Sequence, residues 1–105
     1  MRDTLGRLEA VIAERRGASA GSSYVASLFA KGREKIAQKF GEEATETVIA
    51  ALSGDPAKLT SEAADLLFHL MVLLVEGGVG FDDVLAELDR RDGISGIAEK
   101  AARKD

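Results

Sequence analysis

Apolar side chains recur along this chain at the three- and four-residue spacing that is typical of α-helices. Between the first two such stretches lies a Gly- and Ser-rich segment, residues 17–23, which predicts a loop. No stretch shows the alternation that is typical of a strand. The pattern predicts an all-α fold, a bundle of four to five helices joined by short loops. The predicted helices are residues 4–16, 24–30, 33–52, 56–76 and 84–91, followed by a weakly amphipathic tail at 94–105.

Residues that favour helix ends stand at most of these boundaries. Gly32 predicts a break between the second and third helices, and Gly77 with Gly78 ends the helix at 56–76. Pro56 suits the first position of a helix because its missing N–H needs no partner there. The candidate N-terminal caps are Asp3 or Thr4, Ser22 or Ser23, Asp55, and Asp82 or Asp83.

The helix predicted at residues 33–52 carries its charges on one side. The opposite face should pack inward and consists of Ile36, Phe40, Ala44, Thr47, Val48 and Ala51. The charged face consists of Lys35, Lys39, Glu42, Glu43 and Glu46. Three carboxylates within five residues repel one another unless a cation lies among them. The alternative is an ordinary solvated face with Lys–Glu pairs.

The helix predicted at residues 56–76 is apolar around nearly its whole circumference, which is typical of an interior or an interface. Its one polar stripe consists of Glu62, Asp65, His69 and Glu76. Charges on a buried helix are costly unless they are paired or bind a metal. A small protomer cannot cover this helix, so we expect a homodimer that completes the bundle, with Met71 and Val75 pointing outward.

Composition narrows the class of protein. Hydrophobic residues make up 46% and charged residues 30%, which indicates a single globular domain over residues 1–105 with its core at about 5–100. The chain has no cysteine, which excludes disulfides, thiolate zinc sites and cysteine nucleophiles. We find no signal peptide, and the apolar stretch at 63–75 is too short to span a bilayer, so we expect a cytoplasmic protein without a membrane partner. A net charge of -4 argues against a nucleic-acid polymer as partner.

The two acidic stretches point to metal chemistry if their helices face each other. Ligand sets made only of oxygens suit a hard cation, Mg²⁺ before Mn²⁺. Mg²⁺ commonly bridges carboxylates to phosphate oxygens and can supply a nucleophilic water. Lys35 and Lys39 lie within two turns before Glu42 on the same face, where they can reach phosphate oxygens. The five carboxylates predicted to share a cleft as catalytic and metal-binding residues are Glu42, Glu43, Glu46, Glu62 and Asp65.

His69 is more simply explained as a satisfied core or interface residue than as a metal ligand. The role we expect for it is a hydrogen bond that orients Asp65. A di-iron bundle would need two Glu-x-x-His motifs. The chain has a single histidine, and Glu62 is followed at that spacing by Asp65, so a di-iron site is excluded.

The motif Glu42-Glu43-x-x-Glu46, followed by Glu62-x-x-Asp65, resembles the metal-binding signature of the MazG-like all-helical nucleoside triphosphate pyrophosphohydrolases. The surrounding sequence is similar to one family within them, the phosphoribosyl-ATP pyrophosphohydrolases, over roughly residues 5–100. The stretches that carry this resemblance are Ser23-Tyr24, Lys31-Gly32-Arg33-Glu34-Lys35-Ile36, Gln38-Lys39-Phe40-Gly41-Glu42-Glu43-Ala44, Glu62 to Leu70, and Val84-x-x-Glu87-Leu88-x-x-Arg91.

The resemblance implies Mg²⁺-dependent hydrolysis of phosphoribosyl-ATP to phosphoribosyl-AMP and pyrophosphate, the second step of histidine biosynthesis. It also implies a homodimer with a site built by both subunits, and a stand-alone enzyme without a fused cyclohydrolase. Ser23, Tyr24 and Arg91 are candidate substrate contacts, although a helix cap explains Ser23 and a core aromatic explains Tyr24 equally well. The alternatives are a house-cleaning nucleoside triphosphate pyrophosphohydrolase and a non-catalytic helical interaction module.

Overall fold

The computed structural model describes residues 2–92, and within that range it contains helices and no strand. The all-α prediction is therefore confirmed, while the predicted tail at 94–105 and the end of the predicted core lie outside the described residues. The elements are α1 (Arg2–Arg15), a 3-10 turn η1 (Ala20–Ser22), α2 (Tyr24–Lys31), α3 (Arg33–Ser53), α4 (Pro56–Glu76) and α5 (Phe81–Arg91).

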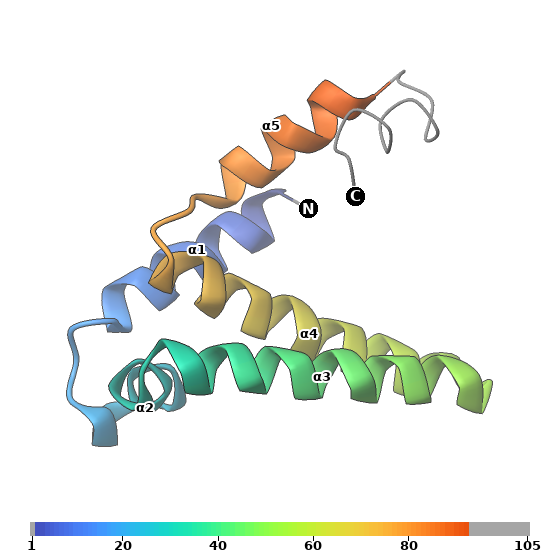
Figure 1. The fold of residues 1–105 in the computed structure, drawn as a ribbon, viewed down its shortest axis with the longest axis horizontal. Coiled ribbons are helices and arrows are strands. Elements are labelled where there is room, and N and C mark those ends of the chain that lie inside the picture. The colour runs from blue at the N-terminus through green and yellow to red at the C-terminus, as the bar shows by residue number, and fades with distance from the viewer. Residues whose placement is uncertain (1, 93–105) are drawn as a thin grey trace.

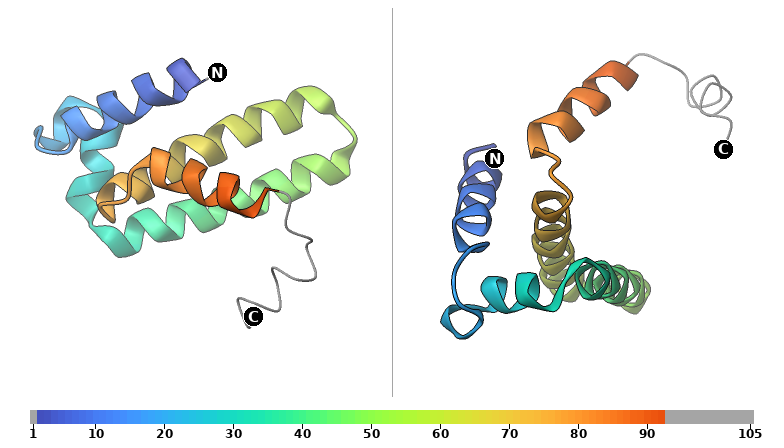
Figure 2. Two further views of the ribbon diagram at one scale, coloured as in Figure 1. Left: turned by 90° about the horizontal axis from the view of Figure 1, so that it is seen from above. Right: turned by 60° about the vertical axis from the view of Figure 1, so that its left-hand side comes forward.

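The centre of the fold is an antiparallel hairpin formed by the two long helices α3 and α4. They lie side by side along most of their length, and α1 packs against the C-terminal half of α4 (Figure 1). The short helix α2 connects α1 to the start of α3 at a sharp angle, and α5 turns away from the hairpin (Figure 2). Gly32 permits the turn between α2 and α3 because its φ of 94° is one that L side chains rarely adopt.

Three of the predicted helix boundaries are confirmed in atomic detail. The Ser23 hydroxyl accepts a hydrogen bond of 3.0 Å from the Ala26 N–H and so caps α2. The Asp55 carboxylate accepts from the Ala57 N–H at 3.0 Å, and Pro56 follows it as the first residue of α4. Gly54 ends α3 in the left-handed region, with φ 78°. Local side-chain chemistry therefore sets the ends of the hairpin helices.

Two predicted starts differ from the structure. α1 begins at Arg2, so Asp3 and Thr4 lie inside its first turn and neither caps it. α5 begins three residues earlier than predicted, because the Asp83 carboxylate accepts from the Gly80 N–H at 3.2 Å and so acts from the third helical position. The Phe81 N–H donates to the Glu9 carboxylate at 2.9 Å, which ties the start of α5 to α1.

The core lies where α1, α2, α3 and α4 meet. Its buried side chains are Ile12, Val25, Leu28, Ile36, Met71 and Val72. Met71 is only 1% exposed within one protomer, so the prediction that it points outward is wrong. Val48 and Ala51 are exposed although they were predicted to pack inward, whereas Glu43 is buried. The reason is that the buried side of α3 shares Ile36 and Thr47 with the predicted face but extends toward Glu43 and Ala50 instead of Val48 and Ala51.

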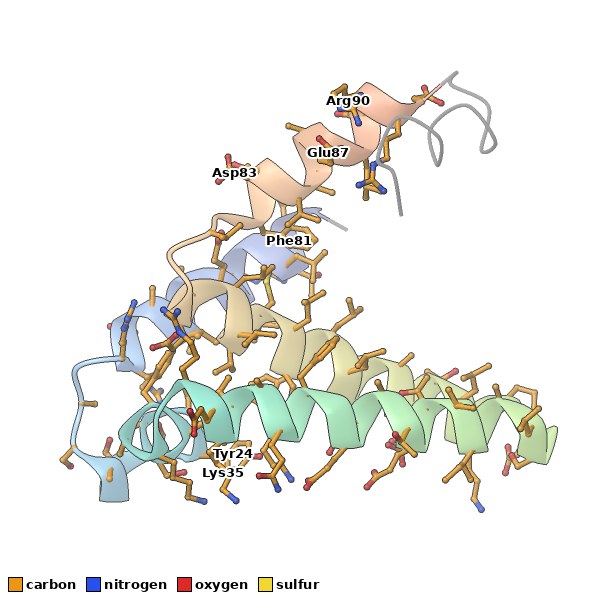
Figure 3. All side chains as sticks on the ribbon, viewed as in Figure 1. Tyr24, Lys35, Phe81, Asp83, Glu87 and Arg90 are labelled. Carbon is orange, nitrogen blue, oxygen red and sulfur yellow. The ribbon has the colours of Figure 1, made fainter. Side chains whose placement is uncertain are left out.

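Several large apolar side chains remain exposed on the hairpin and on α5. Leu52 is 83% exposed, Ile49 62%, Val48 59% and Leu88 56%. Phe81, the first residue of α5, packs against the core, while Asp83 and Arg90 further along point away from the hairpin (Figure 3). Among the described residues no single helix has the length and apolarity to cross a bilayer. Only α4 and α5 taken together are long and apolar enough, and the angle between these two helices is 107°.

Two arginines hold the C-terminal end of α4. Arg16 donates to the carbonyls of Val75 and Glu76 at 3.0 and 3.5 Å, and its guanidinium lies 5.6 Å from the centre of the Phe29 ring. Arg33 pairs with the Glu76 carboxylate and also donates to the Glu76 carbonyl. The last carbonyls of a helix have no partner within the helix, so these cations satisfy them and offset the helix dipole. The contacts join the end of α1 and the start of α3 to α4.

We expect Arg16→Ala to lower the free energy of unfolding by about 1 kcal/mol, because it removes the carbonyl bonds and the contact with Phe29. Urea denaturation measures the change. The neighbouring Arg15→Ala is the control and should alter stability by less than about 0.5 kcal/mol, since Arg15 is exposed. Equal losses in the two variants would contradict the assigned role of Arg16.

Candidate metal centre and active site

The register of the α3–α4 hairpin is set at its middle by Thr47. Its hydroxyl lies 2.8 Å from the Glu43 carbonyl on its own helix and 3.2 Å from the Glu62 carbonyl on α4. A threonine that bonds the carbonyl four residues back is common inside helices, but here the hydroxyl also contacts the facing helix. This contact places Glu43 opposite Glu62 and Asp65. The sequence pattern identified Thr47 only as a packing residue.

Glu43, Glu62 and Asp65 form a cluster in which one carboxylate oxygen of each lies within 4.8 Å of those of the others. Glu43 is 8% exposed, Glu62 is half-buried and Asp65 is exposed. One oxygen of Glu43 and one of Glu62 are fully buried and have no hydrogen-bond partner among the described residues. Buried carboxylate oxygens without partners are strongly unfavourable, and a cation bound among them would supply the missing partner. Because every ligand atom is a carboxylate oxygen, a hard divalent cation fits this donor set.

The electrostatics of Glu62 agree with this geometry. Burial raises the pKa of its carboxyl, and the nearby charges of Glu46, Asp65 and Glu43 raise it further. Glu46 therefore lies at the edge of the cluster, beside Glu62, although it is exposed. Four of the five predicted carboxylates come together: Glu43, Glu46, Glu62 and Asp65.

The metal-free protein should lose stability as pH rises, through Glu62. The folded state holds its proton more tightly than the unfolded chain, so this contribution is present below the unfolded pKa and is lost as pH rises through the raised folded pKa. Glu62→Gln removes the loss. Its melting temperature relative to the parent should therefore be higher at about pH 7 than at about pH 4, measured without metal by calorimetry.

Glu42→Gln is the matched comparison and should show the opposite trend. In the parent protein the Gln38 hydrogen bond and Lys39 lower the pKa of the Glu42 carboxyl. The contribution of Glu42 to stability is therefore present above its unfolded pKa and is lost in acid. The Glu42 variant should therefore be relatively less stable at about pH 7 than at about pH 4. A Glu62 variant with the same pH trend as the Glu42 variant would rule out our account of the cluster.

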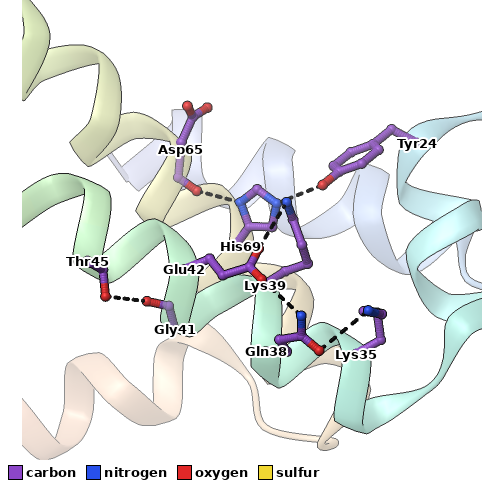
Figure 4. A network of polar contacts seen from close by, with 9 residues as sticks. All are labelled: Tyr24, Lys35, Gln38, Lys39, Gly41, Glu42, Thr45, Asp65 and His69. Atoms are coloured by element: carbon purple, nitrogen blue, oxygen red, sulfur yellow. Dashed lines mark hydrogen bonds and ion pairs between the residues drawn. The ribbon is translucent and has the colours of Figure 1, made fainter.

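Glu42 lies outside the cluster. Its carboxylate accepts from the Gln38 amide at 2.9 Å, and the Lys39 ammonium is 3.5 Å from its other oxygen (Figure 4). Lys35 lies one turn earlier and contacts the Gln38 amide oxygen at 3.4 Å. Lys39 is the more enclosed of the two lysines, with 32% of its side chain exposed. The prediction that Glu42 is a metal ligand thus stays a prediction without support from this arrangement.

Tyr24 of α2 and His69 of α4 are hydrogen-bonded to each other, and His69 lies one turn after Asp65. The Tyr24 hydroxyl is 3.0 Å from His69 Nε2, and His69 Nδ1 is 2.8 Å from the main-chain carbonyl of Asp65 (Figure 4). His69 is buried, as expected, but it contacts the Asp65 carbonyl rather than the carboxylate that we expected it to orient. Attraction to the Tyr24 oxygen, and then to Glu42 and Glu43, raises the pKa of Lys39, while partial burial opposes the shift.

The other two candidate substrate contacts, Ser23 and Arg91, have other partners. Ser23 uses its hydroxyl to cap α2. Arg91 is on α5 and donates to the Glu87 carboxylate at 3.0 Å. Hydrogen bonds from Arg90 and Arg91 lower the pKa of Glu87 to about 2. Within one protomer α5 leads away from the α3–α4 hairpin that carries the acidic cluster, and Arg91 is at its far end (Figure 1).

A pocket of about 240 Å³ opens directly beside the acidic cluster. Its lining residues are Glu46, Ile49, Ala50, Ser53, Lys58 and Glu62. The sequence pattern did not single out Lys58 or Ser53, since only the hairpin brings them next to the carboxylates. A larger pocket, of about 390 Å³, lies between α1 and the segment before α5. Its lining is mostly aliphatic, and its one carboxylate, Glu9, is already bonded to Phe81, so we assign the chemistry to the smaller pocket.

The fold and the site together define an all-helical protein with a carboxylate cluster that could hold a metal ion, set in a helical hairpin. The family model of phosphoribosyl-ATP pyrophosphohydrolase matches residues 5–92 of the chain. The chain therefore belongs to the phosphoribosyl-ATP pyrophosphohydrolase family, within the all-helical MazG-like superfamily.

Curated relatives agree with this family. The chain is 70% identical to the phosphoribosyl-ATP pyrophosphatase of Rhizorhabdus wittichii, over 98% of this chain and 97% of the relative. It is 63% identical to the phosphoribosyl-ATP pyrophosphatase of Dinoroseobacter shibae, over 94% of this chain and 97% of the relative. The protein of the same name from Zymomonas mobilis is 62% identical, over 96% of this chain and 94% of the relative. The resemblance inferred from the motifs is thus confirmed.

Proposed function

We propose that this chain hydrolyses phosphoribosyl-ATP to phosphoribosyl-AMP and pyrophosphate, in the second step of histidine biosynthesis. The observation that carries the proposal is the Glu43–Glu62–Asp65 cluster with two buried, unpartnered oxygens, in a chain of this family. The names of the relatives favour this substrate over free nucleoside triphosphates. The cluster also argues against a non-catalytic interaction module. If its carboxylates served in salt bridges, their buried oxygens would have partners. The cytoplasmic location stays a prediction.

The cation we propose is Mg²⁺, with Mn²⁺ as a substitute, because the donors are all oxygens and the substrate carries phosphates. Glu43, Glu62 and Asp65 would hold it, with Glu46 at the edge of the cluster. When bound, the metal lowers the pKa of a bound water and neutralises charge on the leaving phosphate. The three carboxylates would thereby determine where along the α3–α4 hairpin the hydrolysis takes place.

The polyphosphate needs cations from the protein as well, and Lys39 and Lys35 are the residues we propose for this role. Both lie on the face of α3 that leads into the cluster, and the Lys39 ammonium is 3.5 Å from the Glu42 carboxylate (Figure 4). A lysine in a partly enclosed site binds phosphate oxygens more strongly than one in free solvent, because the local dielectric is lower. We therefore assign the larger share of phosphate binding to Lys39.

The decisive experiment measures pyrophosphate release from phosphoribosyl-ATP by the purified chain. We expect release with Mg²⁺ or Mn²⁺, none after a chelator, and recovery on re-addition of the metal. ATP and other nucleoside triphosphates are assayed in parallel. Faster hydrolysis of those nucleotides would assign the chain to house-cleaning chemistry, and metal-independent or absent release would overturn the proposal.

We propose, in addition, that the active form is a homodimer. The support is the row of exposed apolar side chains on α3, including Val48 and Leu52, together with the unpacked helix α5. A small protomer gains stability when a second copy covers such surfaces. Dimerisation would also bring residues of α5, including Arg91, to a surface of another protomer.

Light scattering at micromolar concentration should give the mass of a dimer for the parent protein. The double variant Val48→Glu with Leu52→Glu should be monomeric and still helical, because both residues are exposed within the protomer. Met71→Glu is the contrasting variant and should unfold the protomer itself, since Met71 is in the core. A monomeric parent protein would refute the dimer.

A further inference from the structure

The pocket beside the acidic cluster extends from the cluster toward the closed end of the hairpin, where α3 connects to α4 (Figure 1). Its volume is about 240 Å³, and Glu46 and Glu62 lie at the end nearest the cluster. Ile49 and Ala50 supply apolar surface, and Lys58 lies one turn before Glu62 on the same face of α4. A concave and partly apolar surface with a few charged groups is typical of a small-molecule site.

Lys58 has no structural role that would explain its charge. It is the one cation among the described residues that line this pocket, and its ammonium forms no ion pair within the part of the chain that the structure describes. It is exposed and is the third residue of α4. A positive charge in the first turn of a helix opposes the helix dipole, so this charge does not stabilise α4. The Lys58 ammonium is therefore available to a ligand in the pocket.

Lys58 and Lys39 lie on opposite sides of the acidic cluster. The Thr47 hydroxyl contacts the Glu62 carbonyl, so these two residues lie side by side in the hairpin. Lys39 is eight residues before Thr47 on α3, and Lys58 is four residues before Glu62 on α4, which runs in the opposite direction (Figure 1). At about 1.5 Å per residue, the two backbone positions are roughly 18 Å apart along the hairpin, with the cluster between them. This spacing leaves room for a nucleoside between two phosphate-binding lysines.

The proposed substrate carries phosphate at both ends. The triphosphate of ATP is at one end, and the phosphate of the phosphoribosyl group is at the other. Release of pyrophosphate breaks the bond between the first and second phosphates of the triphosphate, counted from the ribose, and this bond must lie at the metal cluster. Because we assign the leaving pyrophosphate to Lys39, the rest of the substrate extends past the cluster in the other direction, into the pocket that Lys58 lines.

We propose that this pocket binds the phosphoribosyl-AMP half of the substrate, and that Lys58 contacts the phosphate of its phosphoribosyl group. The inference rests on the proposed function and names the part of that site which distinguishes phosphoribosyl-ATP from free ATP. Ile49 and Ala50 contact the nucleoside, and Lys58 supplies the charge for the second phosphate. ATP has no phosphate at that end and gains nothing from Lys58. Val48 and Leu52, which the proposed dimer covers, do not line the pocket.

Calorimetric titration of the two reaction products separates the two ends of the site. Phosphoribosyl-AMP should bind the parent protein at least about tenfold more tightly than AMP, which lacks the second phosphate. Lys58→Gln should remove that advantage and leave the affinity for AMP unchanged. Pyrophosphate with Mg²⁺ should bind Lys58→Gln as it binds the parent. Lys39→Gln should show the reverse pattern, with a larger loss of affinity for pyrophosphate than for phosphoribosyl-AMP.

Two further variants and the kinetics complete the test. Lys58→Arg keeps the charge and should retain most of the affinity for phosphoribosyl-AMP. Lys31→Gln is the matched control and should bind phosphoribosyl-AMP as the parent does, because Lys31 is also exposed but lies on α2. In steady-state assays Lys58→Gln should raise KM for phosphoribosyl-ATP by about tenfold and keep kcat within about twofold, since the lysine is remote from the bond that breaks.

Three outcomes would overturn the inference. They are a parent protein that binds AMP and phosphoribosyl-AMP equally, a Lys58→Gln variant that binds phosphoribosyl-AMP as tightly as the parent, and an equal loss of affinity in Lys31→Gln. A parent protein that fails to hydrolyse phosphoribosyl-ATP would overturn the proposed function instead. The titrations with products need no turnover, so the two failures are distinguishable.

Discussion

Glu43→Gln is expected to lower the turnover of phosphoribosyl-ATP by at least about a hundredfold while the protein stays folded. Glu43 is a member of the cluster, and one of its oxygens is buried without a hydrogen-bond partner among the described residues. Glutamine has nearly the same shape, so the substitution removes the charge without opening a cavity. Removing one of three adjacent negative charges should also relieve repulsion in the metal-free protein.

Steady-state kinetics and metal titration by calorimetry together measure this effect. Weaker binding of Mg²⁺ or Mn²⁺ should accompany the loss of turnover. Glu34→Gln on the same helix is the control and should leave both unchanged, because Glu34 is exposed and lies in the first turn, well before the cluster. A Glu43→Gln variant with near-normal rates would mean that the acidic cluster is not the active site.

Glu42→Gln, measured alongside, resolves a disagreement between sequence and structure. The motif predicts that Glu42 binds the metal, whereas its carboxylate faces Gln38 and Lys39. From the structure we expect a smaller loss than for Glu43→Gln, of less than about tenfold, without a change in metal affinity. A loss equal to that of Glu43→Gln, with weakened metal binding, would restore Glu42 to the ligand set.

Lys39→Gln is expected to lower kcat/KM by roughly ten- to a thousandfold. The reason is that the Lys39 side chain is only 32% exposed and lies beside the Glu42 carboxylate, where its charge acts on phosphate with less solvent screening. Lys35→Gln should have a smaller effect, since Lys35 is exposed and contacts only the Gln38 amide among the described residues. Circular dichroism should show that both variants remain helical.

Lys31→Gln provides the matched control, because Lys31 is an exposed lysine at the end of α2 and its loss should leave kinetics unchanged. If Lys39 only formed a surface pair with Glu42, its removal would alter stability by less than about 1 kcal/mol and leave kinetics nearly untouched. Unchanged kinetics in both Lys35→Gln and Lys39→Gln would leave the metal cluster standing and remove our account of phosphate binding.

Helix positions in this protein follow from local sequence. The spacing of apolar residues, Ser23 and Asp55 as caps, and Gly32 and Gly54 as breaks define the limits of α2, α3 and α4 almost to the residue. These signals act over one turn of helix, so no tertiary contact is needed to read them. The start of α5 was misplaced because Asp83 can serve either as a cap or as the third helical residue, and the bond from Phe81 to Glu9 of α1 favours the second.

The sequence by itself determined an all-helical chain with two acidic motifs on two long helices, and with them the family. Only the tertiary structure decided which carboxylates converge. Glu42 and Glu43 are neighbours about 100° apart on the helix, and both lie on the polar face. Because α4 packs along Glu43 and Thr47, Glu43 is buried, whereas Glu42 stays exposed beside Lys39. The pairing of Tyr24 with His69 was equally invisible, because it depends on how α2 folds back onto α4, a long-range arrangement that periodicity within single helices does not encode.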